Sequence, residues 1–255
     1  MSNQAHPIAL ITGGSRGLGR SMAQHLARRG VDLVITYQSR SDAAEEVVAE
    51  ARRADRRAVA LRLDVGDSSS FAAFAEQLRG ELAQRFEQDR FDYLVNNAGN
   101  GIHASFEGTT EAQFDELMRI HVKGPFFLTQ ALLPLLRDGG RILNVSSGLA
   151  RFTLPGYAAY ASMKGAVEVL TRYQAKELGA RGITANTLAP GAIETDFGGG
   201  AVRDNPQINA MVASMTALGR AGLPDDIGAA VAALLGPECG WMTGQRIELS
   251  GGQSL

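Results

Sequence analysis

Seven short runs of apolar and β-branched residues alternate with longer helical patterns along the chain of 255 residues. This alternation is typical of β-α-β units, in which crossover helices join parallel strands. No internal repeat, low-complexity segment or long polar linker divides the chain. The pattern therefore predicts an α/β fold of the Rossmann-like, doubly wound type, with one seven-stranded parallel sheet and a single domain over residues 1–255. The expected strands are Ile8 to Thr12, Asp32 to Tyr37, Ala58 to Leu63, Tyr93 to Asn96, Arg141 to Ser146, Thr184 to Leu188 and Arg246 to Leu249.

Helical patterns separate these runs, at Gly19 to Arg29, Ala43 to Arg53 and Phe114 to Leu136 among others. The third pattern contains Pro125 and Pro134. Proline lacks an amide hydrogen and crowds the preceding helical turn, so we expect these two residues to kink or break the helix.

Composition excludes several classes of protein. A hydrophobic content of 45% is sufficient for a full core, and a formal charge of -2 argues against nucleic-acid binding. The single cysteine, Cys239, permits no intrachain disulfide. No targeting segment and no apolar stretch of about 20 residues is present, so we expect a cytoplasmic protein without a membrane span. The four histidines lack metal-ligand spacing, and we expect no metal.

A glycine-rich turn follows the first expected strand and leads into a helical pattern, with the spacing Gly13-x-x-x-Gly17-x-Gly19. Glycines let a pyrophosphate approach the main chain, and the free amide groups at a helix N-terminus bind anions. No Gly-Lys-Ser/Thr follows, which argues against an NTPase P-loop. The turn predicts a dinucleotide site, although a glycine turn without a ligand remains an alternative.

Ser147, Tyr160 and Lys164 form a candidate proton-transfer site. Residues four apart share a helix face, which places the Lys164 ammonium beside the Tyr160 phenol. A cation there favours the phenolate, so we expect it to lower the Tyr160 pKa from about 10 toward the working range of a general acid or base. Ser147, at the end of an apolar run, is placed to hydrogen-bond a substrate oxygen.

In order and in approximate spacing, these motifs resemble the short-chain dehydrogenase/reductase family. The resemblance covers essentially the whole chain and rests on the glycine turn, the run from Asn96 to Gly99, Ser147, the pair Tyr160 and Lys164, and Pro190-Gly191. It extends through the segment 193–196, which the family places over the nicotinamide, and to Thr243-Gly244-Gln245 and Gly251-Gly252.

The resemblance implies hydride transfer between NADP(H) and a small-molecule carbonyl or alcohol. It implies that Tyr160 is the general acid or base, that Ser147 orients the substrate oxygen, and that Lys164 lowers the Tyr160 pKa and binds the nicotinamide ribose. It further implies a homotetramer or homodimer, paired through the helices at 114–136 and 157–178 and the last strand. The cofactor-binding residues that it implies are Gly13, Ser15, Arg16, Gly17, Leu18, Gly19, Tyr37, Arg40, Asp64, Val65, Asn96, Ala98, Gly99, Tyr160, Lys164, Pro190, Gly191, Ile193 and Thr195.

The choice of NADP(H) over NAD(H) follows from charge. An acid at the end of the second strand binds the ribose 2'-hydroxyl of NAD, whereas the 2'-phosphate of NADP requires a cation. In the family's pattern that position is Tyr37, which carries no charge, and Arg16 and Arg40 supply nearby cations. Arginine binds phosphate oxygens in a forked geometry, so we expect NADP(H).

His121 departs from the family's pattern, in which an asparagine usually holds a water connected to the catalytic lysine. Three interpretations remain open: a working relay, passive packing beside Pro125, and impaired catalysis. A relay through histidine is expected to titrate near pH ~6.5, unlike one through asparagine.

The segment 197–222 breaks the alternation and is the expected substrate lid. Gly198-Gly199-Gly200 supplies a hinge, and Ile208, Met211, Val212 and Met215 form a helical apolar stripe. Packing of that stripe against the body is an equal alternative.

The substrate itself is left open. One alternative function is a non-enzymatic, nucleotide-binding regulatory protein, and another is an alcohol dehydrogenase for sugars or steroid-like alcohols. A 3-oxoacyl carrier-protein reductase requires a basic patch for its acidic partner. Arg172, Lys176 and Arg181 are candidates for that patch, diluted by Asp138 and Glu177.

Overall fold

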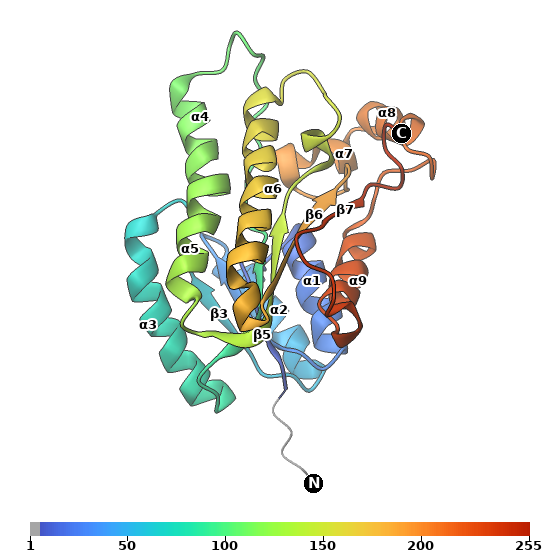
Figure 1. Ribbon diagram of the computed structural model, residues 1–255. Helices are drawn as coiled ribbons and strands as arrows, with labels where there is room; N and C mark the ends of the chain where they lie inside the picture. The colour runs from blue at the N-terminus through green and yellow to red at the C-terminus, as the bar shows by residue number, and fades with distance from the viewer. Residues whose placement is uncertain (1–5) are drawn as a thin grey trace.

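The computed structural model describes residues 6–255, which form one seven-stranded parallel sheet flanked by helices on both faces (Figure 1). The strand order is β3-β2-β1-β4-β5-β6-β7. The order reverses between β1 and β4, and in sheets of this kind ligands bind outside the carboxyl ends of the strands at such a reversal. The strands are β1 (Ile8–Ile11), β2 (Asp32–Tyr37), β3 (Ala58–Arg62), β4 (Phe91–Asn96), β5 (Leu136–Val145), β6 (Thr184–Pro190) and β7 (Arg246–Leu249).

The two faces of the sheet carry separate hydrophobic cores. Along β1, Ile8 and Leu10 belong to one core and Ala9 and Ile11 to the other, because successive side chains of a strand point to opposite faces. The first core packs under α3 (Phe71–Glu81), α5 (Gly124–Leu132) and α6 (Ala158–Leu178), and the second under α1 (Gly17–Arg28), α2 (Ser41–Arg53) and α9 (Pro224–Leu234). The expected doubly wound fold is confirmed.

Most of the expected strands agree with the structure, and β2 and β7 agree to the residue. The largest difference is β5, which begins at Leu136 rather than at Arg141. The additional residues contain Gly139-Gly140, which look like a turn in sequence, yet Leu136 pairs with Phe91 across an irregularity in the β4–β5 ladder. A long-range strand partner outweighs the local turn preference here.

The helical pattern at 114–136 is interrupted, as its prolines suggested, but by a π-helical turn before Pro125 rather than by a kink or break at a proline. α4 (Glu111–Met118) passes into a π-helical turn (Arg119–Lys123), and α5 follows directly. Pro125 lies in the first turn of α5, where its missing amide is tolerated, and Pro134 lies beyond the end of that helix. In an α-helix residue 125 would donate to the carbonyl of His121, so Pro125 removes that donor at the π-turn.

Of the helices that the structure describes, none combines the length and the apolar character needed to cross a membrane.

Candidate active site

The segments that follow β1, β4, β5 and β6 meet at one edge of the sheet. These four strands are neighbours, and all run in the same direction. The glycine turn, the run 96–99, Ser147 and Pro190-Gly191 therefore lie side by side, as the sequence predicts.

Close backbone contacts shape the glycine turn. A Cβ on Gly19 would lie 2.2 Å from the carbonyl oxygen of Gly13, and a Cβ on Gly13, whose φ is +65°, would lie 3.0 Å from the Cα of Ala98. The turn thus has no room for side chains at either position, and it packs directly against the chain that follows β4.

Thr12 and Asn97, which sequence reasoning did not single out, hold this arrangement together. The Thr12 hydroxyl accepts hydrogen bonds from the amides of Asn97 (2.9 Å) and Ala98 (3.0 Å). The Asn97 side-chain amide donates to the carbonyl oxygens of Thr12 (2.9 Å) and Gly13 (3.2 Å). Thr12 directly precedes the glycine turn, and Asn97 belongs to the run from Asn96 to Gly99, which is their only signal in the sequence.

The amino end of α1 is available to an anion. Its first residue, Gly17, follows Arg16, whose side chain makes no capping hydrogen bond. Ser15 is buried and Leu18 half-buried, while a Cβ on Gly17 would lie 3.6 Å from the Thr195 side chain. The structure therefore brings the glycine turn against the segment 193–196, in which Ile193 pairs with Gly222.

The cations expected beside a 2'-phosphate lie at the correct edge of the sheet. Tyr37 ends β2, and Arg40 directly precedes α2. The exposed Arg40 contacts Asp42 through two hydrogen bonds of 3.2 Å, and Arg16 lies 3.7 Å from Asp196. Exposed ion pairs contribute about 0–1 kcal/mol, so a phosphate dianion can compete for these side chains.

Two other expected cofactor residues lie after β3. Asp64 is exposed there and accepts a hydrogen bond from the amide of Gly66 (2.8 Å), and Val65 is half-buried beside it.

The Asn96 side chain is buried. It is 5% exposed and donates to Asn144 (2.8 Å) and Thr129 (3.1 Å) inside the molecule. Its side-chain nitrogen thus joins β4 to β5 and α5, and the expected contact of Asn96 with the cofactor stays a prediction.

Tyr160 and Lys164 lie on the first turns of α6, and both side chains are buried. The Lys164 Nζ is 5.5 Å from the centroid of the Tyr160 ring and donates to the carbonyl oxygen of Val145 (2.8 Å), the last residue of β5. The Ser147 hydroxyl accepts a hydrogen bond from the amide of Leu149 (3.2 Å), which leaves its own hydrogen free to be donated. The structure brings together the three residues that the sequence predicts.

Burial sets the ionisation of this pair. It raises the pKa of the Tyr160 phenol above its usual value, and the Ser147 hydroxyl opposes that shift only in part. Burial also lowers the pKa of Lys164 from 10.5 to about 7. The expected lowering of the Tyr160 pKa by the lysine is therefore wrong for the protein without bound ligands, because desolvation of the phenolate outweighs the attraction of a cation that is itself desolvated.

His121 lies in the π-helical turn, 2% exposed, with its ring edge-on to Tyr160 at 5.3 Å between centroids. Its Nε2 is 2.8 Å from the carbonyl oxygen of Asn100, so Nε2 carries the hydrogen and donates it. Its Nδ1 is buried and has no hydrogen-bond partner within residues 6–255. The Asn100 side chain is in turn held by Glu116 (2.6 Å).

The expected titration of His121 near neutrality is wrong. Burial, and next the charge of Lys164, lower its pKa from 6.5 to about 2. The imidazole is therefore neutral at all ordinary pH values, with Nδ1 as a hydrogen-bond acceptor on the side of Gly99.

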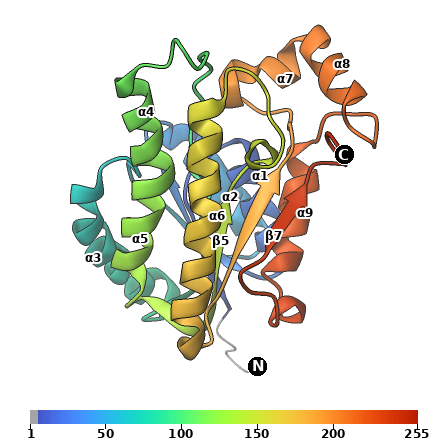
Figure 2. The same cartoon turned by 45° about the horizontal axis from the view of Figure 1, so that its top comes forward.

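The segment 197–222 lies over this edge of the sheet, beside the beginning of α6, in both views (Figure 2). The glycines 198–200 all have positive φ, and they precede α7 (Ala201–Asp204) and α8 (Pro206–Ser214). The Phe197 ring lies 5.7 Å from that of Tyr160. Of the four stripe residues Val212 is buried, Ile208 and Met215 are half-buried, and Met211 is 45% exposed, so the stripe packs only in part against the rest of the protein.

Residues 13–254 match a family model described as enoyl-(acyl carrier protein) reductase. The hydroxynaphthalene reductase-like protein Arp2 of Metarhizium brunneum is 37% identical, over 97% of this chain and 95% of that protein. The chain belongs to the short-chain dehydrogenase/reductase family.

Solved structures of reductases have the same fold. LugOII, a promiscuous reductase that catalyses keto-reduction at C1 during lugdunomycin biosynthesis, is 38% identical with a TM-score of 0.93, and the match covers 100% of both chains. The angucycline C-6 ketoreductase LanV, solved with bound NADP, is 35% identical with a TM-score of 0.92, over 97% of this chain and 95% of that one. This chain thus has the fold of these two reductases, with Ser147, Tyr160 and Lys164 at the carboxyl edge of its sheet.

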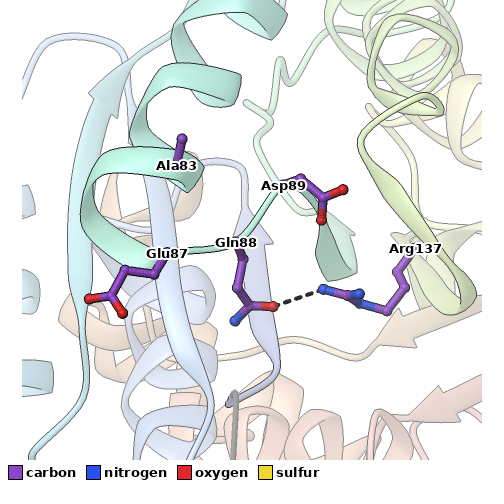
Figure 3. Close-up of a pocket in the computed structure, with 5 residues that line it drawn as sticks. All are labelled: Ala83, Glu87, Gln88, Asp89 and Arg137. Atoms are coloured by element: carbon purple, nitrogen blue, oxygen red, sulfur yellow. Dashed lines mark hydrogen bonds between the residues drawn. The ribbon is translucent and has the colours of Figure 1, made fainter. Parts of the chain in front are cut away.

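A hollow lies at the opposite, amino-terminal edge of the sheet of this short-chain dehydrogenase/reductase (Figure 3). It measures about 630 Å³, is open to solvent, and includes none of the site residues above. Arg137 crosses it to Gln88 (2.8 Å) and to Asp92 (2.9 Å). Its lining residues are Ala83, Glu87, Gln88, Asp89 and Arg137. Within residues 6–255 no group of three or more histidine, cysteine or acidic side chains is arranged to hold a metal ion.

The depressed pKa of His121 predicts acid sensitivity. Between pH 6.5 and about 2 the unfolded chain binds a proton that the folded protein does not, so folding stability falls as pH falls through this range. His121→Asn removes that linkage. From pH 7 to pH 5 the wild type should lose about 2 kcal/mol more unfolding free energy than the variant, as measured by urea denaturation. The matched control is His103→Asn, at an exposed histidine, and equal losses in wild type and His121→Asn would contradict the assignment.

Proposed function

We propose that this protein is an NADP(H)-dependent carbonyl reductase in which Tyr160 is the general acid. The observation that carries the proposal is the placement of Ser147, Tyr160 and Lys164 at the same edge of the sheet as a glycine turn that has no room for side chains at Gly13 and Gly19. The similarity to LanV, solved with NADP, and to LugOII, which performs keto-reduction, supports the same reaction class.

The residues fit a dinucleotide. The uncapped end of α1 and the turn at 13–19 would hold the pyrophosphate, and Arg16 and Arg40 the 2'-phosphate. Asp64 and Val65 would contact the adenine, and the residues of 190–195 the nicotinamide. The nicotinamide, when bound, supplies the hydride.

Side chains of the protein supply the proton that the substrate oxygen gains. The raised pKa of Tyr160 keeps the phenol protonated at neutral pH, which is the form that a general acid needs. Ser147 donates a hydrogen bond to the substrate oxygen and orients it, and Tyr160 transfers its proton to that oxygen. The Lys164 ammonium, 5.5 Å from the ring, stabilises the phenolate that results. Nδ1 of His121 is buried without a partner among the described residues and can accept a hydrogen bond from a water, which favours the relay interpretation over impaired catalysis.

We further propose a fused-ring aromatic ketone as the substrate class. The ring centroids of Tyr157 and Phe197 lie 6.4 and 5.7 Å from that of Tyr160. Tyr157 directly precedes α6, and Phe197 follows β6 in the sequence. Flat aromatic substrates gain from such contacts. The relative Arp2 is named for hydroxynaphthalene, whose two rings are fused and aromatic. The segment 197–222, which carries Phe197, would act as the lid.

The carrier-protein alternative is less well supported. Arg181 contacts Asp138 (2.7 Å) and the carbonyl oxygens of Leu133 (3.0 Å) and Leu136 (2.6 Å), near the beginning of β5. It is therefore occupied at the sheet edge opposite the site, and does not form a docking patch beside it.

Tyr160→Phe should remove turnover and leave NADPH binding nearly intact, because the phenol transfers a proton but holds little of the cofactor. The readout is NADPH absorbance loss with a panel of ketones and aldehydes that includes 1-tetralone and 3-oxoacyl thioesters. Retention of most of kcat would show that the assigned acid is wrong. A wild type that binds NADPH and reduces nothing in the panel would favour the regulatory alternative.

NADPH should bind more tightly than NADH, because Tyr37 offers no carboxylate to repel the 2'-phosphate and two arginines lie nearby. Arg16→Ala combined with Arg40→Ala should reduce or abolish this preference without weakening NADH comparably. Fluorescence titration of both cofactors provides the measurement, with Arg79→Ala, at an exposed arginine of α3, as the control. Equal dissociation constants for the two cofactors in the unaltered protein would refute the charge argument.

We also propose a homodimer or homotetramer in the cytoplasm. Apolar side chains are exposed along α4, α5 and α6, and those most exposed there are Phe114, Met118, Phe126, Phe127, Val169 and Tyr173. Two copies of this surface would cover each other. Light scattering at micromolar concentration should give at least twice the 27.0 kDa of one chain, and a mass of one chain would contradict the proposal.

A further inference from the structure

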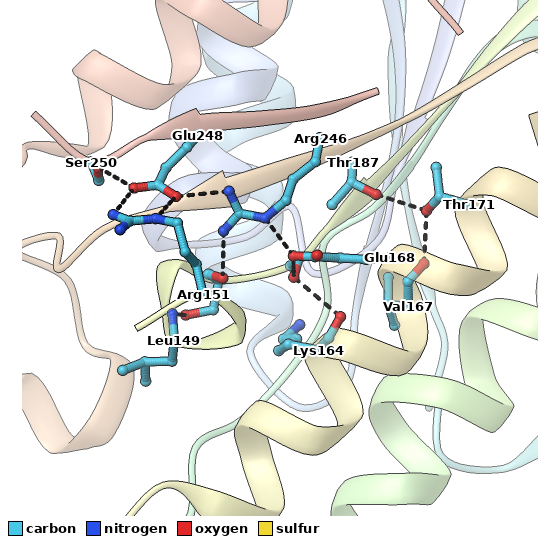
Figure 4. A network of polar contacts seen from close by, with 12 residues as sticks. Leu149, Arg151, Lys164, Val167, Glu168, Thr171, Thr187, Arg246, Glu248 and Ser250 are labelled. Atoms are coloured by element: carbon cyan, nitrogen blue, oxygen red, sulfur yellow. Dashed lines mark hydrogen bonds and ion pairs between the residues drawn. The ribbon is translucent and has the colours of Figure 1, made fainter. Parts of the chain in front are cut away.

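Arg246, the first residue of β7, joins three elements of the active site through one guanidinium (Figure 4). Its Nε donates to the carboxylate of Glu168 on α6 (2.8 Å), and its Nη1 donates to Glu248 (2.7 Å). Its Nη2 reaches the main-chain carbonyl oxygen of Ser147 (3.4 Å). The side chain is 25% exposed and touches none of the groups that would react.

Glu168 connects this guanidinium to the lysine helix. It lies one helical turn beyond Lys164, and its carboxylate accepts a hydrogen bond from the Ser146 hydroxyl (2.8 Å). The same hydroxyl is 3.2 Å from the main-chain oxygen of Lys164. The end of β5 and the beginning of α6, which carry Ser147 and Lys164, are therefore held together through Glu168.

Glu248 extends the network to the cofactor side. Arg151, just after the turn that Ser147 begins, binds its carboxylate through two hydrogen bonds of 2.8 and 2.7 Å. Arg151 also donates to the carbonyl oxygen of Gln253 (2.8 Å). The Gln253 side chain in turn accepts from the amide of Ala192 (2.9 Å), beside Pro190-Gly191.

The charges of this network alternate from Glu168 through Arg246 and Glu248 to Arg151, with side chains 16–37% exposed. Arg151, more than Arg246, holds the pKa of Glu248 down at about 2. A charge on a largely buried side chain is costly to leave unpaired. Removal of the central arginine would leave Glu168 without its cation, whereas Glu248 keeps Arg151. The loss would therefore loosen the contact of Glu168 with the segments that carry Ser147 and Lys164.

We propose that Arg246 is a positioning residue that sets the distance between the Ser147 hydroxyl and the Tyr160–Lys164 face of α6. The proposal rests on the carbonyl reduction argued above. It makes the last strand, far from Ser147 in the sequence, a determinant of the reaction rate.

The test compares Arg246→Gln, Arg246→Lys and Arg181→Gln. Arg181 is a matched control, because it too joins a carboxylate to main-chain carbonyls, but at the opposite edge of the sheet. Arg246→Gln should lower kcat roughly ten- to hundredfold, since small displacements of reacting groups have effects of that order. KM for the ketone and Kd for NADPH should stay within about twofold. Arg246→Lys should recover part of kcat, and Arg181→Gln should lose only stability.

A double variant tests whether Arg246 acts through Glu168. If Arg246 acts through Glu168, the double variant Glu168→Gln with Arg246→Gln should be no slower than Arg246→Gln alone. A folded Arg246→Gln with unchanged kcat, or losses in kcat that simply multiply in the double variant, would overturn the proposal.

Amide hydrogen exchange at residues 146–150 gives a readout without turnover. Exchange there should accelerate in Arg246→Gln and not in Arg181→Gln, and unchanged protection in Arg246→Gln would also overturn the proposal. Wild type and Tyr160→Phe are assayed alongside. A wild type without turnover, or an active Tyr160→Phe, would count against the carbonyl reductase assignment, and the exchange result would still decide the role of Arg246.

Discussion

The hydrogen bond from the buried Lys164 ammonium to the carbonyl oxygen of Val145 is the interaction on which the site depends. It fixes the beginning of α6 against the end of β5, and so places Tyr160 beside Ser147. Because that end of the strand is desolvated, a buried cation and a buried phenol both shift toward their neutral forms. Tyr160 therefore stays protonated at neutral pH, and Lys164 titrates near neutrality. Both properties follow from burial of the two side chains against the end of β5.

The π-helical turn around His121 follows from the same geometry. Pro125 offers no amide to the carbonyl of His121, and the helix widens where the imidazole packs against Tyr160. The Asn100 carbonyl selects the tautomer with hydrogen on Nε2, which leaves Nδ1 as a buried acceptor on the side of Gly99. Histidine at this position therefore functions as a neutral polar group, and its burial removes the pH response that its free pKa suggests.

Local patterns were sufficient for much of the fold and for the catalytic trio. The β-branched runs identified β2 and β7 to the residue, because those strands end at clear turn signals. The early beginning of β5 depends on pairing with Phe91, which is distant in sequence. Spacing placed Lys164 beside Tyr160, but it carried no information on burial and so gave the wrong direction for the Tyr160 pKa. The side-chain hydrogen bonds of Asn96 could not be predicted for a similar reason, since its partners Thr129 and Asn144 lie on other elements. The network of Arg246 has no local signature at all.

The most direct test of this account is the ionisation of Lys164 in the protein without cofactor. Selective ¹⁵N labelling of lysine and NMR titration of Nζ, assigned with Lys164→Met, measure it in isolation. The account predicts a pKa of about 7, set by burial against the Val145 carbonyl. Titration of Lys164 at its ordinary value of 10.5 would mean that the lysine is solvated, and would contradict the proposed origin of the site's chemistry.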